Sequence, residues 1–75
     1  MKEIKINATR ASVTRRVGDD RWIRIVEDGV VVGVRDGWVQ IWDPITIEGR
    51  LINTRPELAE WFPLEAKCLR VVFYD

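Results

Sequence analysis

Tryptophan and arginine are the residue types of this chain best suited to recognition chemistry. The sequence has four tryptophans, and nine of its twelve basic residues are arginine. A guanidinium group forms planar, bidentate hydrogen bonds and stacks on aromatic rings, which an ammonium group does less well. Both residue types are enriched among the side chains that contribute most to protein interfaces. The composition therefore indicates binding by stacking and ion pairing.

The residue types that usually perform catalysis are few. The chain has no histidine, the commonest general base and metal ligand, and its single cysteine, Cys68, has no disulfide partner within the sequence. Cys68 lies in an apolar run, so we expect a small core residue and not a nucleophile. Asp19 and Asp20 follow Gly18 without the rest of a calcium loop, so they indicate a turn. We therefore expect no enzyme activity, no metal and no cofactor.

Residues 21–43 must position most of the recognition chemistry. This stretch contains two Asp-Gly pairs, Asp28-Gly29 and Asp36-Gly37, between runs of β-branched and aromatic residues. Such pairs favour the two-residue type I′ turn of a β-hairpin. The pattern predicts a central meander of three antiparallel strands over residues 22–27, 30–35 and 38–42.

Two-residue turns also predict which side chains lie opposite one another. One face of the meander is apolar, with Val32 opposite Ile41. The other face has three rows: Trp22, Arg35 and Trp38; then Arg24, Gly33 and Gln40; then Val26, Val31 and Trp42. We expect Arg35 to stack between two indole rings, and Gly33 to leave a shallow depression.

The second face of the meander supplies the candidate partner-binding residues, which are Trp22, Arg24, Arg35, Trp38, Gln40 and Trp42. Two interpretations of this face are open. In the first, the rest of the chain covers the face, and the tryptophans are core residues of a small barrel. Alternatively, the face is an exposed recognition surface rich in tryptophan and arginine.

The rest of the chain predicts further strands and one short helix. We expect strands over residues 2–8, 13–17 and 66–74, a small hairpin of residues 45–47 and 51–52, and a turn over residues 9–12. Thr54 and Glu57 have capping-box spacing, and Leu58, Trp61 and Phe62 have the spacing of an apolar helical stripe. These signals predict a helix over residues 56–62.

The elements together predict one domain, residues 1–75, of the α+β class and mostly β. We expect a small antiparallel curled sheet or partly open barrel of five to six strands, with one short helix in the C-terminal half. The predicted core consists of Ile4, Ile6, Ile23, Ile25, Val32, Val34, Val39, Ile41, Leu58, Trp61, Phe62, Leu69, Val71 and Phe73.

Charge and hydropathy narrow the expected partners and location. Twelve basic and twelve acidic residues give a formal net charge of zero, which argues against a dominant contact with a nucleic-acid backbone. No apolar run approaches the roughly 20 residues of a membrane span, and no signal peptide is recognisable. We expect a cytoplasmic location and no membrane contact.

Non-catalytic protein binding is the function that these observations favour. The small, charge-balanced, cofactor-free and β-rich make-up is similar in kind to phage- or mobile-element-encoded inhibitors of bacterial defence enzymes, anti-CRISPR proteins among them. That similarity implies steric blockade of a larger partner, and no motif carries over residue by residue. Two alternatives are a single-stranded nucleic-acid-binding module that uses the Trp/Arg sheet face, and a structural subunit of a homo-oligomer such as a homodimer.

Overall fold

Antiparallel strands form almost all of the regular structure. The computed structural model describes residues 4–44, 46–47, 50–51 and 55–74. In these residues the chain forms β1 (Arg10–Arg16), β2 (Trp22–Arg35), β3 (Trp38–Trp42), β4 (Thr46–Ile47), β5 (Arg50–Leu51), the 3-10 turn η1 (Pro56–Leu58), β6 (Glu60–Pro63) and β7 (Leu69–Tyr74). The prediction of a mostly β fold with an antiparallel sheet is confirmed.

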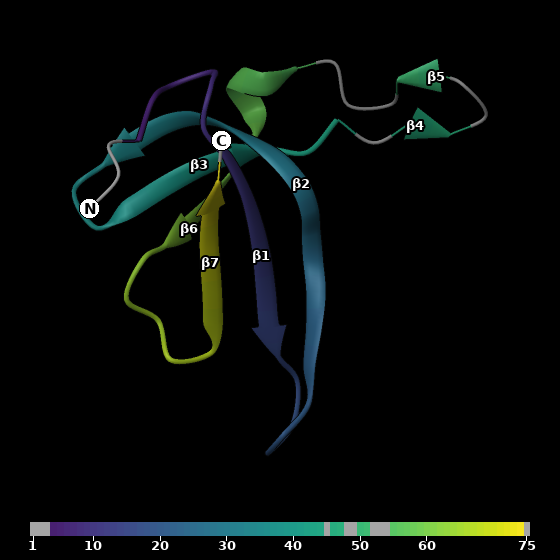
Figure 1. Ribbon diagram of the computed structural model, residues 1–75, viewed down its shortest axis with the longest axis vertical. Coiled ribbons are helices and arrows are strands. Elements are labelled where there is room, and N and C mark those ends of the chain that lie inside the picture. Colours follow the sequence, from purple (N-terminus) through teal and green to yellow (C-terminus); the bar gives the residue numbers. More distant parts are fainter. Residues whose placement is uncertain (1–3, 45, 48–49, 52–54, 75) are drawn as a thin grey trace.

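Strand β2 is the centre of a five-stranded sheet with the order β6-β3-β2-β1-β7. The N-terminal part of β2 pairs with β1, and its C-terminal part pairs with β3. This long strand curves through the molecule, so the sheet curls (Figure 1). Strands β6 and β7 are the two edges, which leaves the curled sheet open. Strands β4 and β5 form a separate two-stranded antiparallel sheet at the position of the predicted small hairpin. Residues 45 and 52 of that prediction lie outside the described residues.

The predicted turn at Asp28-Gly29 is wrong, and with it the three-strand meander. Strand β2 runs straight through both residues. Gly29 is buried, and a Cβ atom there would overlap Ile41 Cγ2 and lie 2.9 Å from Val26 Cγ1. The glycine thus permits close packing instead of a reversal of the chain.

The second Asp-Gly pair does form the predicted hairpin. Asp36-Gly37 joins β2 to β3, and Arg35 lies opposite Trp38 as expected. Of these two residues, only Gly37 has a positive φ (77°), so the turn is not type I′, which needs a positive φ at both central residues. A bulge between Val31 and Gly33 then shifts the register, so Val31 and not Val32 lies opposite Ile41.

The core differs from the predicted one because of these register changes. Its buried cluster consists of Ala11, Val13, Val26, Val31, Val39, Ile41 and Phe62, with Ile4, Leu69, Val71 and Phe73 packed against it. Seven predicted members are therefore confirmed. Five predicted core residues are exposed instead: Ile6, Ile23, Ile25, Val34 and Leu58. Ile23 and Ile25 are exposed because β2 does not fold back at Asp28 to cover them.

The predicted helix over residues 56–62 is wrong except for its first turn. After η1 the chain extends into β6, where Phe62 pairs with Val39 and Trp61 with Gln40. Arg55 occupies the N-cap position without a side-chain capping bond, and Thr54 lies outside the described residues. A helix this short is marginal by itself, so pairing with the free edge of β3 is the better use of these backbone groups.

The first strand lies later in the chain than predicted. Residues 1–3 lie outside the described residues, residues 4–8 contain a turn at 6–8, and strand β1 includes residues 10–12, which were expected to turn. The backbone explains the shift: Asn7 adopts a φ of 67° and donates its N–H to the Val31 carbonyl at 2.7 Å. The strand predicted over 13–17 is confirmed for residues 13–16, which belong to β1, and the strand predicted over 66–74 is confirmed for residues 69–74, which form β7. Residues 66–68 precede β7 and are not part of the strand.

Candidate functional site

Two rows of side chains cross β2, β3 and β6 on the outer face of the sheet. Arg35, Trp38 and Pro63 form the first row. Gly33, Gln40 and Trp61 form the second. The predicted pairs Arg35–Trp38 and Gly33–Gln40 are therefore correct, but β6 supplies the third member of each row in place of Trp22 and Arg24.

Trp61 fills the depression that Gly33 leaves. A Cβ atom on Gly33 would lie 2.9 Å from Cη2 of the indole, so the ring rests directly on the glycine backbone. The guanidinium carbon of Arg35 lies 4.4 Å from the centre of the same ring. The expected cation–π contact of Arg35 thus exists, with Trp61 instead of Trp22 and Trp38. The glycine and the arginine, two residues apart on β2, both contact the indole.

Gln40 lies between Gly33 and Trp61 in the second row. It is buried, not on the exposed surface predicted for it. Its amide nitrogen donates to the carbonyl oxygens of Ala59 at 3.0 Å and Glu57 at 3.3 Å. These bonds connect β3 to the segment between η1 and β6, and so fix the point at which β6 begins.

We name this region the tryptophan surface; it consists of Arg35, Trp38, Trp61 and Pro63. Trp38 is 44% exposed, Arg35 is exposed as well, and Trp61 and Pro63 are half-buried. The backbone N–H of Leu64 donates to the Gly37 carbonyl at 2.9 Å, which places it beside the hairpin turn. The surface thus combines exposed apolar groups with one cation on a hydrogen-bonded framework.

The other predicted site residues lie elsewhere. Trp22 and Arg24 are at the opposite end of β2, where Trp22 pairs with Arg16 and Arg24 with Thr14. Trp42 is half-buried at the end of β3. Of the six predicted residues, the structure therefore brings together Arg35, Trp38 and Gln40, and Gln40 is buried there.

Sequence reasoning missed Trp61 and Pro63 because it assigned them to a helix and its end. A signal for the strand was present, since Trp61 and Phe62 are adjacent large aromatics that alternation sends to opposite faces. In the structure Phe62 is 4% exposed and belongs to the core, whereas Trp61 lies on the outer face.

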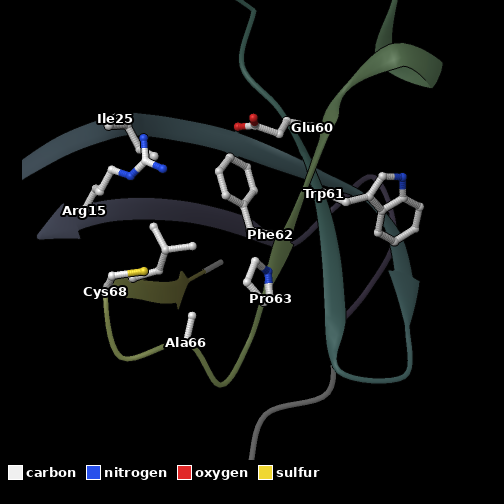
Figure 2. A pocket seen from close by; sticks show the side chains of 9 residues that line it. Arg15, Ile25, Glu60, Trp61, Phe62, Pro63, Ala66 and Cys68 are labelled. Atoms are coloured by element: carbon white, nitrogen blue, oxygen red, sulfur yellow. The ribbon is translucent and has the colours of Figure 1, made fainter.

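A pocket of about 300 Å³ lies where the two sheet edges approach each other, between β6 and the start of β7. Figure 2 shows Phe62 and Arg15 at this pocket, while the Trp61 indole points away from it. Cys68 is exposed here and not a core residue as predicted, because it precedes β7 in a turn. Arg15, Glu60 and Cys68 are among the residues that line the pocket.

No group of three or more potential ligands among histidine, cysteine, aspartate and glutamate occurs in the described part of the chain. Within the same residues, no helix has the length and apolar character needed to cross a membrane.

No protein-family model matches the chain, and no curated protein or solved structure is significantly similar to it.

Proposed function

We propose that this chain is a cytoplasmic, non-catalytic protein-binding module that covers a site on a larger partner with its tryptophan surface. The observation that carries the proposal is the exposure of Trp38, at 44%, between Arg35 and Pro63 on neighbouring strands. Scattered apolar residues are ordinary on a protein surface, but an exposed tryptophan beside an arginine has the composition of an interface hot spot.

Rigidity of the tryptophan surface supports the same function. Gly33 and Arg35 both contact the Trp61 indole, and Trp38 lies between Arg35 and Pro63 on paired strands. Side chains that are already ordered lose little conformational entropy when a partner binds. We therefore expect an affinity that depends on a few rigid side chains rather than on a large flexible area.

Steric blockade is the mode of action that we propose for the module. The exposed tryptophan and arginine side chains offer a recognition surface, which supports binding without chemistry. Small inhibitors of the phage or mobile-element kind act in this way, by occupying a surface that their target needs. The expected consequence is that the chain lowers the activity of its partner in proportion to the fraction of partner bound.

Capture of partners from a nuclease-treated lysate is the first step of the test, followed by affinity measurements with the purified partner. The wild-type chain is compared with Trp38→Ala, and with Val17→Ala as a control that removes another exposed apolar side chain. We expect Trp38→Ala to weaken binding about thirtyfold, the effect of a hot-spot residue, and Val17→Ala to have little effect. Equal affinities of the wild type and Trp38→Ala would contradict the proposal.

Two other outcomes would replace the proposal with one of its alternatives. Loss of all captured partners after nuclease treatment would indicate nucleic-acid binding. A molecular mass that rises with concentration to that of a dimer, and that Trp38→Ala returns to that of a monomer, would indicate a homo-oligomer that uses this surface itself.

A further inference from the structure

A second surface of different character lies at the other end of β2. We name it the arginine surface; it consists of Arg16, Trp22, Arg24 and Arg70. Thr14 of β1 pairs with Arg24 of β2 on one side and with Arg70 of β7 on the other, and Arg16 pairs with Trp22. Alternation along β1 places these side chains on one face of the sheet, opposite the fully buried Val13.

Among the described residues, the three arginines of this surface have no acidic partner. The ion pairs of Arg10 with Asp28 and of Arg55 with Glu57 lie outside the arginine surface. The positive charge of the surface is therefore not compensated by an ion pair within the part of the chain that the structure describes. Because the whole chain has no net charge, this grouping is a segregation of charge to one face.

The arginines are also held in position. The guanidinium carbon of Arg70 lies 3.9 Å from the centre of the Trp22 ring. The Nε atom of Arg16 donates to the Gly18 carbonyl at 2.9 Å. Arg24 and Arg70 flank the same residue on neighbouring strands, so their Cα atoms are about 10 Å apart, twice the strand spacing. Two carboxylates of one partner can reach both groups at once.

Acidic residues limit the positive area at both of its ends. Asp19 and Asp20 lie in the connection between β1 and β2, next to Arg16. At the other end Asp28 is exposed and already binds Arg10 and the hydroxyl of Tyr74. A nucleic-acid strand, with a phosphate at every nucleotide, would meet these carboxylates as it left the surface, whereas a protein can present a few acidic side chains only where arginines lie.

We propose that the arginine surface binds an acidic segment of a second protein, so that the chain has two interfaces at opposite ends of β2. This interface differs from the tryptophan surface in residues, charge and partner chemistry. One domain could then hold its target at one end and an acidic protein at the other. The arginines supply bidentate hydrogen bonds to carboxylates.

Fluorescence anisotropy with the intact chain and a fluorescein-labelled oligo-glutamate peptide tests the proposal. We expect saturable binding to the wild type, and binding at least about tenfold weaker to Arg24→Glu, since each charged hydrogen bond that is lost has at least this effect. Arg55→Glu is the matched control, because it makes the same change in net charge at an exposed arginine outside the surface. Arg24→Ala serves as a milder second variant, and circular dichroism confirms the fold of each protein.

Three results would overturn the proposal. The first is a wild type that does not bind oligo-glutamate. The second is equal weakening of binding by Arg24→Glu and Arg55→Glu. The third is tighter binding of fluorescein-labelled oligo-dT than of the peptide. The last result would assign the arginine surface to single-stranded nucleic acid instead. Trp38→Ala is expected to keep the affinity for oligo-glutamate, so a failure of the proposed function at the tryptophan surface stays distinguishable from a failure here.

Discussion

The molecule contains the same contact twice, in two different settings. Arg35 lies over Trp61 at 4.4 Å on the tryptophan surface, and Arg70 lies over Trp22 at 3.9 Å on the arginine surface. Trp61 contacts the Gly33 backbone beside the buried Gln40, so Arg35 stacks on an indole that is part of the packing of the domain. Trp22 instead lies beneath Arg70, one of the three arginines of the arginine surface.

This difference shows that a cation–π pair does not identify a functional site by itself. Its stacking energy is about 0.5–1 kcal/mol at an exposed position in either setting. The surroundings decide whether the pair completes the packing of the domain or organises charge for a partner. Substitutions under the first pair should therefore affect stability, whereas those around the second should affect binding.

Gly33→Val should have the largest effect on stability. The added Cβ would lie 2.6 Å from Gln40 Oε1 and 2.9 Å from the Trp61 ring, so the indole must leave its position. We expect a loss of about 1–3 kcal/mol in the free energy of unfolding, as for other overpacked sites, together with weaker partner binding. Urea denaturation measures it, with Gly18→Ala as a control whose new Cβ would lie no closer than 3.6 Å to its neighbours. Wild-type stability of Gly33→Val would show that Trp61 moves freely.

Gln40→Leu should have the next largest effect. The substitution removes the two hydrogen bonds to Ala59 and Glu57 and leaves the buried Ala59 carbonyl without its donor, which costs about 1–2 kcal/mol. Thr14→Val, at the centre of the arginine surface, is the counterpart and should change stability by less than about 0.5 kcal/mol. Thermal or urea unfolding of both variants tests the comparison, and equal losses would remove the distinction between the two settings.

Arginine truncation should separate the two pairs by function at a small cost in stability. We expect Arg35→Ala and Arg70→Ala each to lose about 0.5–1 kcal/mol, the energy of one exposed stack. Only Arg35→Ala should weaken binding of the partner captured by the tryptophan surface, and only Arg70→Ala should weaken binding of oligo-glutamate. Anisotropy titrations of both variants with both ligands measure this, and loss of both activities in one variant would indicate a single shared interface.

The pH dependence of Tyr74 is the smallest predicted effect, and it involves Asp28, the carboxylate that also binds Arg10. The hydrogen bond from its hydroxyl to Asp28 raises the pKa of Tyr74 above the ordinary value of 10.0, with burial and the Asp28 charge acting in the same direction. Because the folded-state pKa is the higher one, this contribution to stability is complete below pH 10 and is lost as pH rises through the folded pKa.

Absorbance of tyrosinate measures this pKa directly, since the chain has a single tyrosine. We expect Asp28→Asn to lower the pKa of Tyr74 towards that of the chain in urea. An unchanged midpoint in Asp28→Asn would contradict the assignment of the shift to this carboxylate.

Local pattern was sufficient for several features. Alternation of β-branched and aromatic residues determined the mostly β class, and Asp36-Gly37 determined a hairpin in which Arg35 faces Trp38 and Gly33 faces Gln40. These contacts join residues close in sequence, so turn chemistry and side-chain periodicity carry enough information to predict them. The preference of arginine for an indole was also correct in kind.

Only the tertiary structure decided which strands and which tryptophans come together. Asp28-Gly29 has the same turn preference as Asp36-Gly37, yet Asp28 is bound by Arg10 and Tyr74, and Gly29 is packed against Ile41. These partners lie far away along the chain, and a local window does not contain them. The same competition turned the expected helix into β6, because pairing with β3 satisfies more backbone groups than one isolated helical turn does. It thereby placed Trp61, not Trp22, beneath Arg35.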